Sequence, residues 1–352
     1  MSENKVKKKV LVGMSGGVDS AVTSYLLKLQ GYDVYGITFV LSDNQIEAAK
    51  EAQKICDKLE IPLFVENLTK EFNNDVTSYF VDSYLKGEIP NPCVLCNQIF
   101  KFKNLIDKAD KEKIDFVATG HYSQVLYDNK SDRYILKKAK DLNKDQSYFL
   151  YRLTQKQLSR IILPLWNVEK EEVRSIAKDL GLEVSEKKDS QDICFIKEMD
   201  YTDFIKRTQK DVFDHCTFED MQGNPLGQGS HHIHYTPGQR RGLGKGFNKR
   251  MYVIKKDAKK NKVILGDEQD LFTSSILVDK VNLIMVDDLD SPTPVKVKIR
   301  NTMKETDAII YKQADKIKVD FLSPVRAAVN GQSAVFYQED SLLGGGIIHD
   351  SL

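Results

Sequence analysis

Apolar and polar positions along the first ~200 residues follow two alternating periods, one typical of strands and one typical of helices. Short apolar runs predict buried strands at 9–14, 33–40, 61–65 and 116–119. Apolar residues at helical spacing predict helices at 18–29, 44–59 and 169–180. Strands and helices that alternate in this way predict a parallel sheet covered by helices on both faces.

Beyond residue 205 the pattern changes to short alternating stretches separated by Gly, Asn and Asp. Strands are predicted at 251–254, 262–265, 295–299, 316–321 and 333–337. The acidic segment 287–294 carries two prolines and is predicted to be a loop. Spacing of this kind favours small β-barrels or sandwiches. We therefore expect an α/β domain over 1–205, a small β domain over 206–272 and a C-terminal β-barrel over 273–352.

The composition is that of an ordinary globular protein, with 41% hydrophobic and 29% charged residues. No window holds the ~20 consecutive apolar residues that a membrane-spanning helix needs. The N-terminal segment is polar and basic and leads into the first predicted strand, unlike a secretory signal. We therefore expect a cytoplasmic protein with no membrane partner.

The formal net charge of +1 favours no polyanionic partner. Residues 238–262 depart from this balance, because they hold ten Lys or Arg residues and a single acid, Asp257. Such a run most often forms a solvated face, and contact with a nucleic acid is the alternative.

The segment Ser15-Gly-Gly-Val-Asp-Ser20 lies between the first predicted strand and the first predicted helix. Its two glycines allow a tight turn that presents backbone N–H groups to an anion, and the helix N-terminus adds partial positive charge. The Gly-Lys-Ser/Thr ending of γ-phosphate-transferring loops is absent. Asp19 would repel a bare phosphate, so it is expected to bind Mg²⁺ or to hold a water. The loop therefore fits cleavage of ATP between its α- and β-phosphates, with transfer of AMP to a substrate oxygen.

The alternative for this segment is a strand–helix turn that binds nothing. Its position at the first βα junction argues against that, because ligands bind at the carboxyl ends of parallel strands. The loop therefore favours an ATP pyrophosphatase without indicating which one.

The five cysteines are Cys56, Cys93, Cys96, Cys194 and Cys216. An odd, sparse set in a chain expected to be cytosolic is not a disulfide framework. Cys93 and Cys96 form a C-x-x-C, and Cys194 follows much later. Three interpretations stay open for these three: persulfide or redox chemistry at a low-pKa thiolate, a three-cysteine iron–sulfur cluster, or buried cysteines without chemistry. Cys56 lies in a predicted helix and is expected to belong to the core.

Several long motifs occur in order along nearly the whole chain. They are Gly13-Met-Ser-Gly-Gly-Val-Asp-Ser20, Pro90-Asn-Pro-Cys-Val-Leu-Cys-Asn97, Ala118-Thr-Gly-His-Tyr122, Lys144-Asp-Gln-Ser-Tyr-Phe-Leu150, Asp189-Ser-Gln-Asp-Ile-Cys-Phe-Ile196, Tyr235-Thr-Pro-Gly-Gln-Arg-Arg-Gly-Leu243, Gly331-Gln-Ser-Ala-Val-Phe-Tyr337 and Leu343-Gly-Gly-Gly-Ile347. On these motifs the chain resembles the bacterial-type tRNA-uridine 2-sulfurtransferases (2-thiouridylases), which make 2-thiouridine at the wobble position of tRNA. The resemblance implies an N-terminal ATP pyrophosphatase domain, adenine nucleotide α-hydrolase-like with a parallel sheet, followed by two small β domains.

The resemblance also implies site residues. ATP is expected to contact Gly13, Met14, Ser15, Gly16, Gly17, Val18, Asp19, Ser20, Phe39 and Gly120. The target base is expected to face Asn91, Pro92 and Cys93. Contacts to tRNA are expected from His121, Lys144, Asp145, Gln146, Arg300, Asn301 and Gln332. The basic segment 238–262 falls in the family's central β domain, where it is expected to follow the RNA backbone.

The reaction that the resemblance implies has two steps. ATP, bound with Mg²⁺, adenylates the C2 carbonyl oxygen of the flipped uridine, and sulfur held on the enzyme then displaces AMP. Cys194 carries that sulfur as a persulfide received from a sulfur-relay donor. The sulfur donor is expected to be a relay protein, a desulfurase or sulfide. Attack by Cys96 on the persulfide would release sulfide and leave a Cys96–Cys194 disulfide.

Cys93 departs from the family pattern, because better-known members have aspartate at this position. The substitution removes a carboxylate and completes a set of three thiolates with an open fourth position. A 4Fe–4S cluster on Cys93, Cys96 and Cys194 is therefore predicted, and sulfur transfer by Cys96 and Cys194 alone is the alternative.

Two other functions remain as alternatives. A pyrophosphatase-loop ligase or amidotransferase partner acting on a small molecule would release AMP and pyrophosphate without tRNA. A non-enzymatic iron–sulfur or RNA-binding protein would function equally well without Asp19. Neither explains the β domains, the basic segment and the cysteines together.

Overall fold

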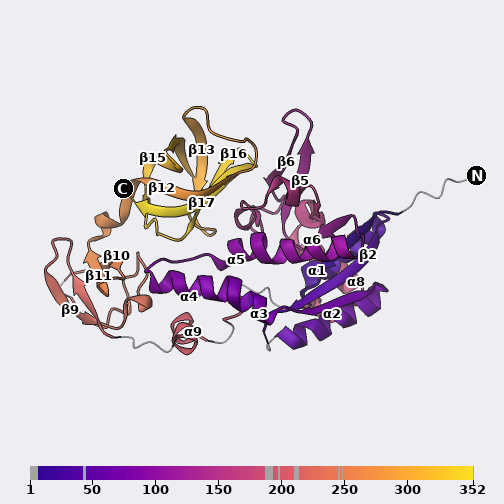
Figure 1. The fold of residues 1–352 in the computed structure, drawn as a ribbon, viewed down its shortest axis with the longest axis horizontal. Coiled ribbons are helices and arrows are strands. Elements are labelled where there is room, and N and C mark those ends of the chain that lie inside the picture. Colours follow the sequence, from indigo (N-terminus) through magenta and orange to yellow (C-terminus); the bar gives the residue numbers. More distant parts are fainter. Residues whose placement is uncertain are drawn as a thin grey trace, which may run out of the picture. The chain divides into compact units, whose positions relative to one another are not determined.

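The computed structural model describes residues 7–42, 45–186, 193–196, 199–209, 214–244, 246–247 and 249–351. The chain divides into two compact units. The first comprises Met1–Val76, Cys93–Gln191 and Asp340–Leu343, and the second comprises Thr77–Pro92, Asp192–Glu339 and Gly344–Leu352. Figure 1 labels many of the helices and strands. In the described part of the chain, no helix is long and apolar enough to cross a membrane.

The first unit is built around a five-stranded sheet with the order β3-β2-β1-β4-β7, in which every pair of neighbours is parallel. Its strands are β1 (Lys9–Gly13), β2 (Asp33–Val40), β3 (Leu63–Asn67), β4 (Phe116–Ala118) and β7 (Ile161–Ile162). In the central strand Val10, Leu11 and Val12 are all 0% exposed, as expected where helices cover both faces of a sheet. The predicted parallel α/β domain is therefore confirmed.

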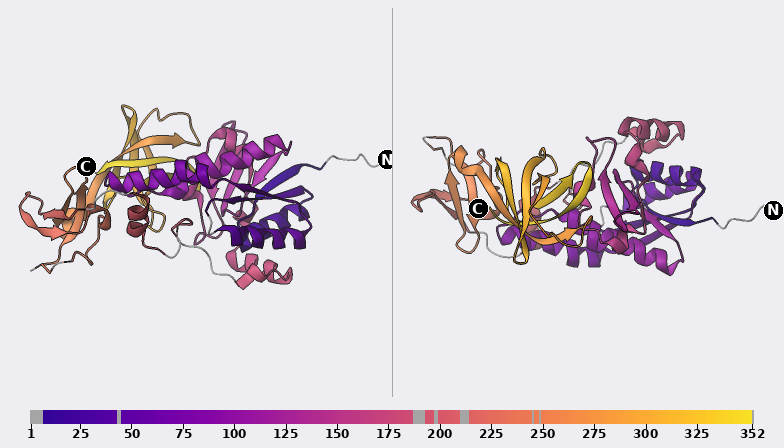
Figure 2. Two further views of the ribbon diagram at one scale, coloured as in Figure 1. Left: turned by 60° about the horizontal axis from the view of Figure 1, so that its bottom comes forward. Right: turned by 90° about the horizontal axis from the view of Figure 1, so that it is seen from above.

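The helices described in the first unit are α1 (Val18–Leu29), α2 (Ile46–Leu59), α3 (Thr69–Phe72), α5 (Pro92–Leu95), α6 (Phe102–Lys111), α7 (Gln155–Leu158) and α8 (Lys170–Asp179). Of these, α1, α2 and α6 pack against the strands of this sheet. α1 and α8 lie side by side, whereas α6 packs against β1 and β4 (Figure 2). α2 forms a helix because its buried residues, Ala52, Ile55, Cys56 and Leu59, recur at helical spacing.

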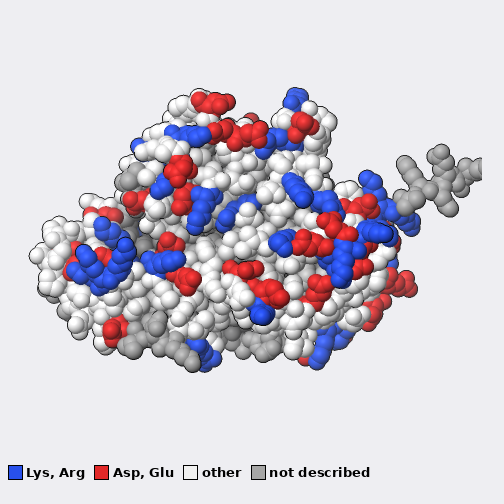
Figure 3. Space-filling view, in the orientation of Figure 1, with Lys and Arg blue, Asp and Glu red and all other residues white. Residues whose placement is uncertain are grey.

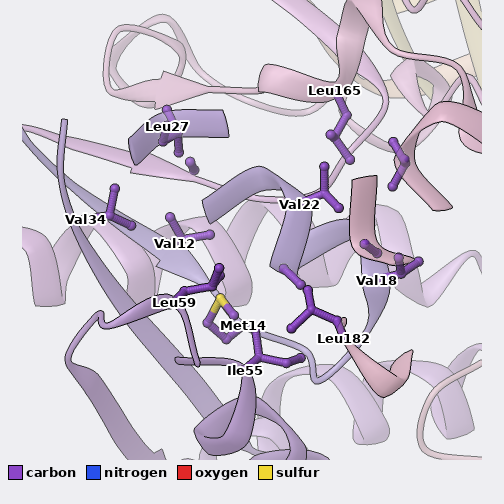
Figure 4. Close-up of a cluster of buried hydrophobic side chains, with 14 of the residues drawn as sticks. Val12, Met14, Val18, Val22, Leu27, Val34, Ile55, Leu59, Leu165 and Leu182 are labelled. Atoms are coloured by element: carbon purple, nitrogen blue, oxygen red, sulfur yellow. The ribbon is translucent and has the colours of Figure 1, made fainter. Parts of the chain in front are cut away.

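One apolar core joins α1, α2 and α8 to β1 and β2. Figure 4 shows its side chains, among them Val12 of β1, Val22 of α1 and Ile55 of α2, pointing toward one another. Met14 and Val18 belong to the same core, so the first turn of α1 is anchored directly beside the predicted pyrophosphate loop. The loop therefore starts and ends on packed elements.

The first unit also contains an antiparallel hairpin that the sequence pattern did not predict. Its strands are β5 (Ser123–Asp128) and β6 (Arg133–Lys138). At its outer edge Lys137 pairs with Ser341, and the backbone N–H of Lys138 donates to the carbonyl of Asp340 at 2.9 Å. Residues from near the end of the chain thus complete the first unit.

The described residues of the second unit include two helices and a four-stranded sheet with the order β10-β11-β8-β9. These elements are α4 (Ser78–Leu85), α9 (Tyr201–Thr208), β8 (Cys216–Glu219), β9 (Pro225–Gly229), β10 (Tyr252–Asp257) and β11 (Lys262–Gly266). Phe80 of α4 and Ile205 of α9 share a buried cluster with Ile233, and Phe218, Val253 and similar side chains form the core of the sheet.

The remaining strands of the second unit form a closed barrel, whose last strand begins in the first unit. They are β12 (Phe272–Leu283), β13 (Thr293–Lys298), β14 (Thr306–Gln313), β15 (Lys316–Arg326), β16 (Ser333–Gln338) and β17 (Ser341–Ser351). The order is β12-β15-β14-β13-β16-β17, and β17 pairs back onto β12. The predicted loop over 287–294 extends too far, because β13 already begins at Thr293. Pro294 is tolerated there because pairing with β16 begins only at Lys296.

Short turns complete the described structure. Single 3₁₀ turns lie at Ser147–Phe149, Pro164–Asn167, Glu183–Glu186, His232–His234 and Glu268–Leu271. Two π-helical turns, η2 (Asn73–Thr77) and η3 (Cys96–Lys101), interrupt the helices that follow β3 and precede β4.

Candidate active site

The predicted pyrophosphate loop connects β1 to α1. Gly16 has φ +70°, and a Cβ added there would lie 2.6 Å from the carbonyl oxygen of Ala48, so this position requires glycine. The Ser20 hydroxyl donates to the carbonyl of Gly17 at 3.0 Å and accepts from the N–H of Ser15 at 3.3 Å. Gly17 is the N-cap of α1 and has no side chain to accept the first helical N–H groups. The turn therefore leaves an anion as the natural partner for those groups.

Residues from the two neighbouring strands flank this loop. β1 lies between β2 and β4, so Phe39 at the end of β2 and Gly120 just after β4 stand on either side of it. A Cβ on Gly120 would lie 2.8 Å from Cβ of Asp19 and 3.0 Å from the backbone nitrogen of Ser20. The residues predicted to contact ATP thus come together at the carboxyl edge of the sheet, where α/β folds bind ligands.

The Asp19 carboxylate is held by two groups that the sequence did not point to. The Lys170 ammonium lies 2.7 Å from Oδ1 and 2.8 Å from Oδ2, and the Tyr122 hydroxyl donates to Oδ1 at 2.8 Å. Lys170 is only 7% exposed and Tyr122 only 2%. Opposite unit charges 4 Å apart attract by about 4 kcal/mol at an effective dielectric constant of about 20. Lys170 therefore offsets the repulsion that Asp19 would exert on a phosphate.

A sequence signal for Lys170 does exist. Lys170, Val173 and Ala177 are the buried residues of α8, and they follow the helical spacing i, i+3, i+7. A lysine on the apolar face of an amphipathic helix is rare unless a buried partner accepts its charge. The pattern could have indicated an acidic partner for Lys170, although not that this partner is Asp19.

His121 follows directly after Gly120. Its Nδ1 lies 2.7 Å from the hydroxyl of Thr119, and its ring packs against that of Phe102 with 5.8 Å between centroids. Burial of the ring, together with the Lys101 ammonium, holds the pKa of His121 well below its usual value. At neutral pH this side chain can therefore donate or accept a hydrogen bond but carries no charge to a phosphate.

Two of the residues expected to contact tRNA also support the site. The Gln146 side chain accepts the N–H of Tyr122 at 3.1 Å, and its backbone N–H donates to the Tyr122 carbonyl at 2.8 Å. The Asp145 carboxylate accepts from the hydroxyl of Ser147 at 2.7 Å and from the N–H of Ala139 at 3.0 Å. Gln146 thus fixes the backbone that places the Tyr122 hydroxyl on Asp19.

The C-x-x-C motif lies where α5 passes into the π-helical turn η3. Cys93 is exposed and Cys96 partly exposed. The turn is fixed by Asn97, whose buried side-chain amide donates to the carbonyl of Phe149 at 3.2 Å. Single π-helical turns inside helices are frequent at functional sites. The motif therefore presents its thiols from a well-anchored turn.

The remaining cysteines divide by exposure. Cys194 is exposed in the second unit, while residues 189–192 of its motif lie outside the described residues. Cys56 and Cys216 are buried, and burial raises the pKa of the first thiol to about 12 and of the second to about 11. Cys56, as predicted, and Cys216 are therefore buried and chemically inert. Cys93 and Cys194 are not buried.

Within the described residues, no three His, Cys, Asp or Glu side chains are grouped so that they could hold a metal ion.

The expected tRNA contacts in the second unit belong to the barrel. Arg300 donates to the carbonyl of Ala327 at 2.9 Å, and the Gln332 amide donates to the carbonyl of Ile89 at 2.8 Å. The side-chain oxygen of Asn301 is buried, and the described residues offer it no hydrogen-bond partner. Arg300 and Gln332 are therefore held by backbone carbonyls of the same unit.

Lys and Arg side chains gather over β10 and β11, as Figure 3 shows. Several are exposed, and three are paired with acids: Lys249 with Asp267 at 2.8 Å, Lys260 with Asp257 at 4.0 Å, and Lys262 with Glu219. A surface hollow of about 520 Å³ beside this sheet is lined by Arg240, Leu243, Phe247, Lys249, Arg250 and Met251. Cationic and aromatic side chains in one hollow suit a phosphate and an unstacked base.

Three family models match the chain. One described as the tRNA methyl transferase HUP domain matches residues 8–198, and one described as the tRNA methyl transferase PRC-barrel domain matches residues 202–267. One described as the aminomethyltransferase β-barrel domain matches residues 273–348. The expected succession of an α/β domain and two small β domains is thereby confirmed.

Similar proteins cover the whole chain. A tRNA-specific 2-thiouridylase MnmA of Acetivibrio thermocellus is 45% identical over 97% of this chain and 99% of its own length. Another, from Clostridioides difficile, is 44% identical over 99% of both chains. Among solved structures, the NMN synthetase of Francisella tularensis is 18% identical with a TM-score of 0.36, and the match covers 60% of this chain and 81% of that one.

Proposed function

We propose, on the premise that the chain belongs to the family of tRNA-specific 2-thiouridylases, that it converts a uridine of tRNA to 2-thiouridine in an ATP-dependent reaction. The observation that carries the proposal is the loop after β1, which is flanked by Phe39 and Gly120 and ends in the neutralised Asp19. That loop suits ATP cleavage at the α-phosphate. The wobble position of the target uridine is a finer prediction that rests on the resemblance.

In the proposed first step, the C2 carbonyl oxygen of the uridine attacks the α-phosphorus of ATP. The bond from this phosphorus to the bridging oxygen breaks, and pyrophosphate leaves with the electron pair. The backbone N–H groups at Gly16 and Gly17 would hold the departing pyrophosphate, and Phe39 would pack against the adenine. Mg²⁺ belongs to this step as part of the substrate, arriving with ATP.

In the proposed second step, sulfur replaces the adenylated oxygen and AMP leaves. Exposure of Cys194 supports its role as the persulfide carrier, because a donor must reach the thiol. Cys96 would then attack the sulfur of Cys194, so that a disulfide forms and the sulfur donated to the base keeps its electron pair. A relay protein or a desulfurase would supply the persulfide sulfur, and a reductant would reset the disulfide. Sulfide as the donor would instead attack C2 of the adenylated uridine directly, so that neither a persulfide nor a disulfide forms.

Asn91, Pro92 and Cys93 would face the target base, and the other contacts would follow the tRNA. His121 and the segment 144–146 would act from the first unit. Arg300, Asn301, Gln332 and the basic segment 238–262 would act from the second. The 4Fe–4S cluster on Cys93, Cys96 and Cys194 stays a prediction, and none of the steps above depends on it.

The test is to incubate the purified chain with an unmodified tRNA transcript, ATP and a sulfide or persulfide donor, and to identify the nucleosides by mass spectrometry. We expect 2-thiouridine that requires ATP, is lost in Asp19→Asn and is retained in Asp33→Asn. Asp33 is the matched control, since it is exposed at the opposite end of β2. The mass of the product distinguishes thiolation from the methylation that two family-model descriptions mention.

Two further outcomes would redirect the proposal. Release of AMP and pyrophosphate without tRNA would favour the small-molecule ligase. Iron and acid-labile sulfide, measured in the anaerobically purified wild type and in Cys93→Asp, decide the cluster: about four irons per chain that are lost in the variant support it. An iron-free wild type that thiolates tRNA leaves the chemistry to Cys96 and Cys194.

A further inference from the structure

Lys170 places a buried positive charge at the pyrophosphate loop from a helix far along the chain. It is the first residue of α8, and α8 packs directly on α1, the helix that the loop begins. Val173 and Ala177 of α8 lie in the same core as Val18 and Val22 of α1. The packing of α8 on α1 in the core therefore fixes where the Lys170 side chain starts, and the side chain itself is buried.

The contacts around Asp19 hold this charge beside the pyrophosphate loop. Lys170 approaches both carboxylate oxygens, Tyr122 donates to one of them, and Gln146 fixes the backbone of Tyr122. A buried ion pair is generally no more stabilising than apolar residues of similar volume. The pair lies at the N-terminus of α1, where pyrophosphate is expected, and the Asp19 side chain remains 35% exposed. A ligand can therefore reach the pair from the loop side.

We propose that Lys170 is a pyrophosphate-binding residue, a role that rests on the proposed use of ATP by this chain. In the free protein its ammonium neutralises Asp19, so the loop presents no net negative charge to the triphosphate. As the α-phosphorus–oxygen bond breaks, Lys170 donates hydrogen bonds to the departing pyrophosphate and offsets its growing charge. The electron pair of the broken bond stays on pyrophosphate.

The two halves of ATP test this role separately, because only one of them carries the pyrophosphate. We would measure dissociation constants for pyrophosphate, AMP and ATP with the full chain by calorimetry, without tRNA or sulfur donor. For Lys170→Met we expect pyrophosphate and ATP to bind about tenfold to a hundredfold more weakly, the range for a lost charge-assisted hydrogen bond, with AMP changed by less than about twofold. Lys170→Arg should recover part of the loss. Lys178→Met, at an exposed position on the same helix, should bind all three ligands like the wild type.

A double variant covers the case in which Lys170→Met fails to fold because Asp19 is left without its cation. Asp19→Asn combined with Lys170→Met removes both charges while keeping similar shapes. If Lys170 contacts pyrophosphate, the double variant still binds it weakly, whereas Asp19→Asn alone does not. Wild-type pyrophosphate affinity in the double variant, or equal losses for AMP and pyrophosphate in Lys170→Met, would overturn the proposal. A wild type that binds ATP but does not thiolate tRNA would refute the proposed function and leave this inference standing.

Discussion

The close approach of Gly120 to the pyrophosphate loop makes Gly120→Ala an informative perturbation. The added Cβ would lie 2.8 Å from Cβ of Asp19, 2.9 Å from its carbonyl carbon and 3.0 Å from the backbone nitrogen of Ser20. Two of these three atoms belong to the backbone, so no side-chain rotation can relieve the contact. Either the loop or the segment after β4 must move.

The size of the effect follows from the cost of overpacking, about 1–3 kcal/mol for an added methyl group in a well-packed site. If that strain falls entirely on the ATP-bound loop, ATP binds roughly fivefold to 150-fold more weakly. If it falls on the folded state as a whole, the melting temperature drops by several degrees. Both quantities therefore need to be measured on the same protein.

The assay is calorimetric titration with ATP, combined with thermal unfolding, for the wild type, Gly120→Ala and Gly246→Ala. Gly246 is the control, because a Cβ added there meets no atom within 4 Å. We expect Gly120→Ala to lose ATP affinity, stability or both, and Gly246→Ala to lose neither. Wild-type affinity together with a wild-type melting temperature in Gly120→Ala would show that the loop is not packed against the segment after β4.

Phe336→Ala should lower the free energy of unfolding by about 3–5 kcal/mol, because its ring is fully buried in the barrel, whereas Phe272→Ala, at a residue 48% exposed, should change it little in the same denaturant titration. The depressed pKa of His121 means that the unfolded chain binds a proton that the native chain does not, so stability should fall as pH drops below about 6.5. His121→Gln should reduce this slope without abolishing it, because burial also lowers the pKa of His231, His232 and His234, and an unchanged slope would refute the assignment. Iodoacetamide followed by peptide mass spectrometry should label Cys194 in the native protein and Cys56 only after unfolding, because burial raises the pKa of the Cys56 thiol to about 12. Early labelling of Cys56 would contradict its place in the core.

The elements predicted best from sequence are those whose own residues carry the signal. The predicted boundaries of α1 and β2 agree with the structure, because each has an uninterrupted apolar pattern of one period. β3 begins at Leu63 and not at the predicted 61, since its ladder with β2 starts where Leu63 pairs with Gly36. The strand extends instead through the polar residues Glu66 and Asn67, because β3 is an edge strand and tolerates polar side chains. A search for apolar runs does not detect these two residues as part of a strand.

In the candidate site, too, features formed by adjacent residues could be predicted from the sequence, whereas contacts between distant residues could not. The loop after β1 could be predicted because glycines, hydroxyls and the strand–helix junction are adjacent in sequence. The partners of Asp19 could not, because Tyr122 and Lys170 reach it only through tertiary packing. Likewise, residues 77–92 follow the first βαβ units in sequence, yet Phe80 packs with Ile205 and Ile233 of the second unit. The sequence pattern within residues 77–92 does not indicate which unit this segment packs against.

The interleaving of the two units has a consequence for how the chain is made. Each unit consists of three separate segments, so neither is encoded by one continuous stretch of the gene. During synthesis, the backbone of Lys138 emerges from the ribosome long before Asp340, the residue whose carbonyl it pairs with in the finished protein. The ATP-binding half therefore stays incomplete until translation is almost over. A nonsense mutation that removes only the final barrel strand would also strip an edge from the half that holds the nucleotide.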